Sequence, residues 1–157
     1  MSRVAGDDLD DYVNNLRKKR DDIGKFIDGF IQRRGNYLIT GAIKRRLFNY
    51  GSDGQGVKLQ QYSDGYKRKK QKQGLRSSPT TLKLTGAWYD SLFIQSTVQR
   101  TGEIKVLSND EKNLLLVEKY GEDILTLTIE EQEFIIKELE EELVAWLNEN
   151  NIKIEFT

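Results

Sequence analysis

The stretch Leu82-Lys-Leu-Thr-Gly-Ala-Trp-Tyr-Asp-Ser-Leu-Phe93 divides the chain into two parts of different character. A basic segment rich in glycine precedes it, and short alternating segments and an acidic, helix-like segment follow it. A break at Thr85-Gly86 and a turn or two of helix after it are expected, and the large side chains favour burial. We therefore expect this stretch to anchor the preceding segment to a sheet. The residues assigned to the anchor are Thr85, Gly86, Trp88, Leu92 and Phe93.

The composition restricts the chemistry. The chain has 157 residues, 37% apolar and 32% charged, which fits a single domain, residues 1–157, with a modest core. It contains no cysteine and no histidine. Disulfides, the usual zinc sites and Ser-His-Asp or Cys-His catalysis are therefore excluded, and the commonest general base is missing. We predict that the protein is not an enzyme and needs no cofactor.

No membrane association is expected either. The polar, acidic start of the chain does not have the pattern of a secretory signal. No stretch approaches the roughly 20 apolar residues that a membrane-spanning helix requires.

The formal net charge is zero, but the charges are separated along the sequence. Residues 44–76 contain ten basic and two acidic side chains, whereas residues 110–157 contain fourteen acidic side chains and four lysines. Opposed segments of this kind can neutralise each other within one subunit, or between neighbouring copies in a head-to-tail assembly.

The first fifty residues predict two amphipathic helices. Apolar residues recur at helical spacing from Asp7 to about Arg34, and Gly35 suits the end of the first helix. The pattern resumes from Asn36 to Asn49, with the basic residues at positions 44–46 assigned to the exposed side. Whether the second helix continues the first or folds back at Gly35 stays open.

Residues 50–81 predict an extended basic loop or arm, because five glycines interrupt the segment and apolar residues are scarce. Loops of this length in a compact domain are generally functional, or ordered only by a partner. Within the arm, Tyr66 to Gln73 can form one or two turns of basic helix.

The remainder predicts a small antiparallel sheet and a final helix. Alternation and turn residues favour strands at 94–100, 104–107 and 114–117, and a closing strand through Ile152, Ile154 and Phe156 at the sheet edge. Thr128 and Glu131 form a capping box at the start of an acidic helix that runs to about Asn148. The expected fold is therefore α+β: N-terminal amphipathic helices, a long basic arm, and a sheet of three to four strands packed by the acidic helix.

The basic arm is the principal candidate site. Its charge suits docking to another protein surface, contact with DNA phosphates, or plain solvation, and the residues alone leave these three open. The acidic helix is the candidate counter-surface, although a charge run on a helix usually faces water and lacks the converging ligands of a metal site. The arm residues are Tyr62, Tyr66, Lys67, Arg68, Lys69, Lys70, Lys72 and Arg76, and the counter-surface residues are Glu138, Glu141 and Glu142.

The order of these parts resembles the virion morphogenesis and tail-completion proteins of tailed bacteriophages. The resemblance rests on Gly51-Ser-Asp-Gly-Gln-Gly56, on Tyr62-Ser63 with Tyr66 and the lysine-rich run, and on Leu84-Thr-Gly-Ala-Trp-Tyr-Asp-Ser-Leu-Phe93. These families carry a T-G-x-L-x-x-S segment before a small sheet, and Trp88 stands where a leucine is commoner. The resemblance covers roughly Asn36 to Thr128. The acidic final helix and the last strand match no motif of the family.

The resemblance implies a structural protein of the phage neck, made in the host cytoplasm and located at the head–tail junction of the virion. It implies a homo-oligomeric ring, a hexamer or dodecamer, with portal or adaptor proteins and tail or neck proteins as partners, around a channel through which genome DNA passes. The alternative from the residues is a nucleic-acid-binding accessory protein that uses the arm 67–76.

Overall fold

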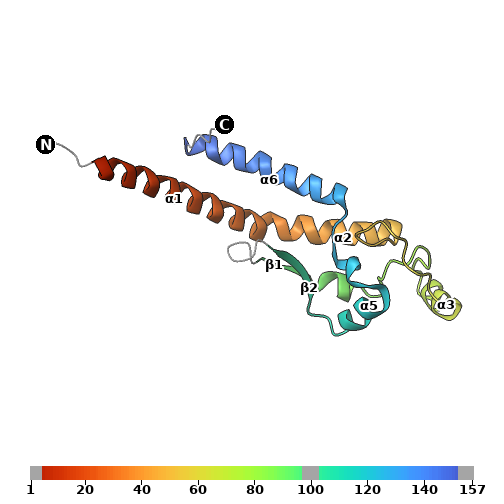
Figure 1. The fold of residues 1–157 in the computed structure, drawn as a ribbon. Helices are drawn as coiled ribbons and strands as arrows, with labels where there is room; N and C mark the ends of the chain where they lie inside the picture. Colours follow the sequence, from red (N-terminus) through yellow and green to blue (C-terminus); the bar gives the residue numbers. More distant parts are fainter. Residues whose placement is uncertain (1–4, 97–102, 152–157) are drawn as a thin grey trace.

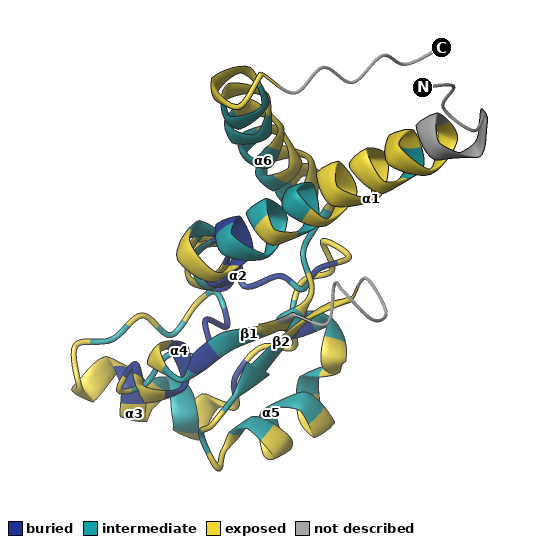
Figure 2. Ribbon diagram, turned by 90° about the vertical axis from the view of Figure 1, so that its left-hand side faces the viewer, coloured by how far each residue is buried: buried dark blue, intermediate teal, exposed yellow. Residues whose placement is uncertain are grey.

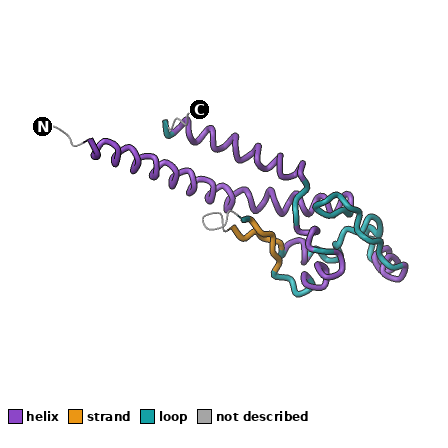
Figure 3. Tube along the Cα trace, in the orientation of Figure 1, coloured by secondary structure: helices purple, strands orange, loops and turns teal. Residues whose placement is uncertain are grey.

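In the computed structural model, which describes residues 5–96 and 103–151, the chain is α+β and mostly helical, with one small sheet (Figure 3). The two N-terminal helices form one continuous rod. Helix α1 (Ala5–Phe30) passes through a single π-helical turn, η1 (Ile31–Gly35), into α2 (Asn36–Tyr50). Of the two alternatives left open at Gly35, the second helix continues the first, since Gly35 has helical φ and ψ of −58° and −42°. Gly35 is buried, and a Cβ there would lie at an ordinary contact distance of 3.5 Å from Ile31.

The acidic helix α6 (Ile129–Glu149) runs back beside the rod, and both helices project from the rest of the molecule (Figure 1). The predicted capping box is confirmed, since Thr128 and Glu131 bond each other's backbone N–H groups. Near the C-terminal end of α6, the Trp146 ring stacks on the Phe26 ring of α1, with centroids 5.1 Å apart. No residue of α6 is fully buried, so the helix pair is thinly packed (Figure 2).

The sheet has two strands among the described residues. Strands β1 (Leu92–Ser96) and β2 (Ile104–Ser108) pair antiparallel, with Leu92 opposite Ser108. The predicted strand at 114–117 is wrong, because these residues lie in helix α5 (Asn113–Tyr120). Leucine is a good helix former, and Asp110 accepts a hydrogen bond from the Lys112 N–H just before the helix. The predicted closing strand at 152–156 lies outside the described residues.

The core lies where α2, the sheet and the 82–93 stretch meet. It is completed by a short 3₁₀ turn, η2 (Glu122–Leu125), after α5. The expected helical turn is present as α4 (Ala87–Asp90), and it buries Trp88 and Tyr89. The buried core residues are Ile39, Ile43, Leu47, Leu82, Trp88, Tyr89, Leu92 and Ile124. We refer to this part of the molecule, which includes α2, as the body, and to α1 together with α6 as the helix pair.

The arm is folded against the body. Its basic segment forms the predicted helix, α3 (Asp64–Lys72). At its start, Gly51 has a φ of +57°, and a Cβ there would lie 2.7 Å from Pro79 at the arm's other end. The Thr80 hydroxyl donates to the Gln60 carbonyl at 2.8 Å. The chain therefore leaves the body and returns to it at one place.

Candidate functional site

The basic helix α3 begins at a side-chain cap and carries its charge toward its C-terminal end. The Ser63 hydroxyl accepts a hydrogen bond from the Tyr66 N–H at 3.3 Å, and Asp64 lies in the first turn. Lysines occupy the last turn. Both choices match the helix dipole, which favours an acid at the N-terminus and cations at the C-terminus.

Lys70 is buried, unlike the rest of the cationic run. Its side chain is 1% exposed, and its ammonium donates to the Lys83 carbonyl at 2.8 Å, to the Thr81 hydroxyl at 3.2 Å and to the Tyr62 hydroxyl at 3.4 Å. These acceptors are all neutral, and burial lowers the pKa of Lys70. Lys70 therefore holds α3 onto the body, and partners do not reach it.

Tyr62 is the second fixed point of the arm. Its hydroxyl accepts the Leu82 N–H at 2.7 Å, and its ring lies 4.6 Å below the Lys70 ammonium and 4.9 Å from the Tyr66 ring. Burial raises the pKa of Tyr62, and hydrogen bonds to Leu82 and Thr81 oppose this effect. Tyr62 and Tyr66, which were assigned to the arm as interface residues, therefore contact each other and the rest of the chain.

The cations of α3 other than Lys70 are at least partly exposed, and we call them the cationic face: Lys67, Arg68, Lys69 and Lys72. Lys67 is half-buried and donates to the Gln61 side chain, and Arg68 donates to the Asp64 carbonyl. Among the described residues, no salt bridge involves α3. Arg76 lies apart from this face, since it donates to the Phe48 carbonyl and lies over the Phe48 ring.

Of the five residues assigned to the anchor, the structure places Trp88 and Leu92 in the core. Gly86 has a φ of +88° just before α4, and the exposed Thr85 hydroxyl accepts the Ala87 N–H. Trp88 is buried, and its indole N–H donates to the Asn113 side chain at 2.9 Å. Leu92 joins the same core, whereas Phe93 is half-buried.

Two of the three residues of the acidic counter-surface are paired within the chain. Arg34 donates to Glu138 at 2.9 Å and also binds Glu142, and these bonds raise the pKa of Arg34, with the Glu142 bond first. Glu141 is exposed. No sequence pattern indicated that Arg34 pairs with α6, because the direction in which α6 runs back along the rod depends on the tertiary structure.

Arg46 corrects a further expectation. It was assigned to the exposed side of the second helix, but it is buried and donates to Glu131 at 2.5 Å and to the Ser52 carbonyl at 2.9 Å. A third bond reaches the Ile124 carbonyl at 3.4 Å. Arg46 thus joins α2, the start of the arm and the capping box of α6. Glu131, the glutamate of that capping box, is the sequence feature that could have indicated this pairing.

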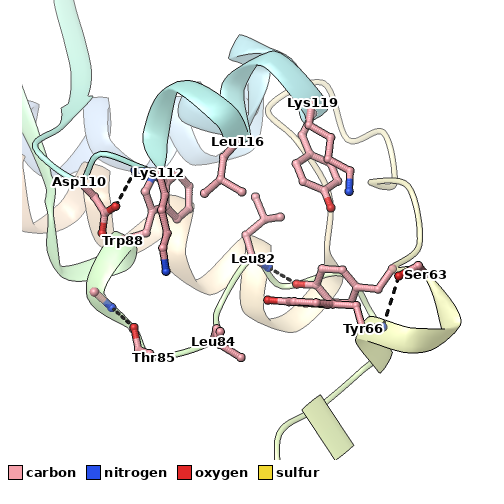
Figure 4. A pocket seen from close by; sticks show the side chains of 14 residues that line it. Ser63, Tyr66, Leu82, Leu84, Thr85, Trp88, Asp110, Lys112, Leu116 and Lys119 are labelled. Carbon is pink, nitrogen blue, oxygen red and sulfur yellow. Dashed lines mark hydrogen bonds between the residues drawn. The ribbon is translucent and has the colours of Figure 1, made fainter. Parts of the chain in front are cut away.

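A cavity of about 260 Å³ lies between the arm, the anchor stretch and α5 (Figure 4). Leu82, Leu116 and Trp88 form its apolar wall, and Lys112, just before α5, and Lys119 of α5 also line it. The space is small, and it suits one side chain of a partner better than a cofactor.

Among the described residues, no helix is long and apolar enough to cross a membrane. The same residues contain no group of three or more acidic side chains placed to hold a metal ion. Comparison of the chain with protein-family models, with curated proteins and with solved structures gave no match in any of the three. The functional proposal therefore depends on the residues and their geometry.

Proposed function

We propose that this protein is a structural protein of a tailed-phage virion that assembles as a homo-oligomeric ring at the head–tail junction. In this proposal it contacts the adjacent portal or adaptor and neck proteins around the DNA channel. The sequence resemblance to tail-completion proteins, centred on Leu84 to Phe93, supplies the family.

The observation that supports assembly is the projecting helix pair. Leu9 and Tyr12 on α1 are each 62% exposed, and Phe134 and Val144 on α6 are more than half exposed. Isolated exposed apolar residues are ordinary, but a helix pair with this many has an incompletely covered apolar surface. Contact with a second copy would cover it, and repetition of one such heterologous contact gives a ring when the rotation between subunits closes.

The cationic face of α3 provides the second half of this contact. It is at least partly exposed on α3, whereas Glu140 and Glu141 are exposed on α6. We propose that α3 of one subunit docks on α6 of the next, beside Glu138 and Glu142, which already bind Arg34 of their own subunit. Lys70 is left out of this contact, since it is buried in its own subunit.

The test is sedimentation velocity at low and moderate salt, with electron microscopy of the largest species. We expect a concentration-dependent oligomer with ring symmetry. Glutamate at positions 67, 68, 69 and 72 should dissociate it. The matched control reverses Arg45, Lys58, Lys112 and Lys119, which carry the same charge, are exposed and lie outside α1, α3 and α6, and it should retain the ring. A wild-type chain that stays monomeric at every concentration and salt would refute the proposal.

A nucleic-acid-binding accessory protein is the second candidate, favoured by the absence of an acidic partner for α3 within the described chain. Its affinity for DNA would fall steeply with salt, because binding releases counterions. Replacing the cationic face by glutamate should then abolish DNA binding, and the control with the same number of reversed charges outside α3 should retain most of it. No binding at low salt would eliminate this candidate.

A further inference from the structure

An apolar groove of about 780 Å³ runs along β2. Four consecutive strand residues, from Ile104 to Leu107, line it together with Val117 of α5 and with Ile135 and Ile136 of α6. Side chains of consecutive strand residues point to opposite faces of a sheet. A groove that touches all four therefore follows the edge of the strand.

The two edges of the sheet differ. The outer side of β1 faces the rod, where the Ile94 N–H donates to the Asn36 side chain at 3.1 Å. In the part of the chain that the structure describes, β2 pairs with β1 alone. The groove thus combines an unpaired strand edge with an apolar wall, which is the arrangement that accepts an added strand.

The chain itself contains a segment of suitable pattern. Apolar residues at Ile152, Ile154 and Phe156 alternate with Lys153 and Glu155. Alternation with a period of two places the three apolar side chains on one face of an extended strand. Such a strand can direct them into the groove and its charged residues toward solvent.

The segment is too far from the groove of its own subunit. Ile136 is the groove residue nearest the C-terminal end of α6, and the 13 residues from there to Glu149 span about 20 Å at about 1.5 Å per residue. The Asn150 and Asn151 N–H groups still bond the last helical turn. Five residues from Asn151 to Phe156 extend at most about 17 Å. Figure 1 shows the C-terminal end of α6 directed away from the sheet.

We propose that residues 152–156 of a second copy add as a strand to the free edge of β2, with their apolar side chains in the groove. This inference rests on the proposed function and deepens it, since it specifies one contact between successive subunits of the ring. The contact is heterologous, because a subunit donates its segment to one neighbour and receives a segment from the other.

The test is a titration of a fluorescent peptide, residues 150–157, against a chain that lacks residues 152–157. We expect saturable binding, detected by fluorescence anisotropy, and no binding of a peptide with Ile154→Lys. Ile136→Lys in the chain should weaken binding about tenfold or more, because it places a charge in the groove. Phe134→Lys is the matched control, since both side chains are 51% exposed on α6 and Phe134 does not line the groove. It should change affinity less than about twofold.

The same variants test the intact protein. Truncation and Ile136→Lys should each dissociate the oligomer, and an equimolar mixture of the two should form dimers, because one retains the groove and the other retains the segment. Circular dichroism verifies that each variant is folded. An oligomer unaffected by truncation would overturn the inference and leave the ring proposal standing. A monomeric wild-type chain would refute the ring, and the peptide titration would then decide the inference: the absence of binding, or equal effects of the two lysine variants, would overturn it.

Discussion

The body and the projecting helix pair have similar apolar patterns in sequence but very different packing. In the body, Ile43, Leu47 and Ile124 are fully buried around the 82–93 stretch. On α6, Ile135 and Trp146 are half-buried, and on α1 Leu9 and Tyr12 are exposed. The difference shows that amphipathic periodicity identifies the apolar face of a helix without identifying what covers it. In the body, other elements of the same chain cover the apolar faces, whereas in the helix pair the chain covers them only in part.

The largest expected effect is in the body. Trp88→Ala should lower the free energy of unfolding by about 3–5 kcal/mol, because it removes a buried aromatic side chain and leaves a cavity. Leu9→Ala on the exposed end of α1 should change it by less than about 0.5 kcal/mol. Denaturant unfolding followed by circular dichroism measures both. Equal losses for the two variants would contradict the division between body and helix pair.

The next effect concerns the junction of arm and body. Lys70→Ala should cost about 1–3 kcal/mol, because the Lys83 carbonyl loses its buried donor. The adjacent exposed Lys69 is the matched control, and Lys69→Ala should be nearly neutral. Thermal unfolding distinguishes them. A neutral Lys70→Ala would show that the buried ammonium does not hold the arm.

Alkaline pH tests the same junction through tyrosine. The Tyr89 hydroxyl donates to the Thr81 carbonyl, and burial raises the pKa of Tyr89 far above its ordinary value of 10. Above pH 10 the unfolded chain loses this proton first, so it binds fewer protons than the folded chain and stability falls as pH rises. Tyr89→Phe should therefore reduce the slope of stability against pH above 10. An unchanged slope would contradict the buried position of Tyr89.

The smallest expected effect is in the helix pair. Arg34 is 43% exposed on its side chain, so its bonds to Glu138 and Glu142 are screened by solvent and contribute little to stability. Arg34→Met should leave the melting temperature nearly constant and accelerate amide exchange along α6. Arg33→Met, one residue away and exposed, is the control. Slow exchange retained in Arg34→Met would mean that apolar contacts alone hold α6.

The sequence correctly predicted structural elements that depend on residues close together in the chain. The Thr128–Glu131 capping box, the basic helix around residues 64–72 and the helical turn after Gly86 depend on neighbouring residues. Gly35 did not end a helix, because glycine adopts helical angles as well as left-handed ones, and its φ of −58° is helical. Residues 114–117 were misread as a strand because a short apolar run has no decisive period.

The candidate site was predicted only in part for a similar reason. A run of lysines and arginines indicates charge, but which one turns inward depends on the acceptors that the fold provides. Lys70 is buried because the Tyr62 and Thr81 hydroxyls and the Lys83 carbonyl accept hydrogen bonds from its ammonium. Tyr62 precedes α3, whereas Thr81 and Lys83 lie well after its end. Arg46 is buried by a carbonyl of the arm and by a glutamate 85 residues away. No local pattern contains these pairings.

The arm leaves the body and returns to it beside the Gln60–Thr80 hydrogen bond, and this closure has a consequence for protease digestion. Gly74 is exposed in the turn after α3. A cut there leaves Tyr62 and Lys70 in the first fragment and residues 81–83 in the second. Tyr62 and Lys70 still bind residues 81–83 across the cut, and Leu82 and Trp88 keep the second fragment in the shared core. The two fragments should therefore stay associated after cleavage. The tip of the arm is thus a place where the backbone can be cut or its sequence replaced while the core stays folded.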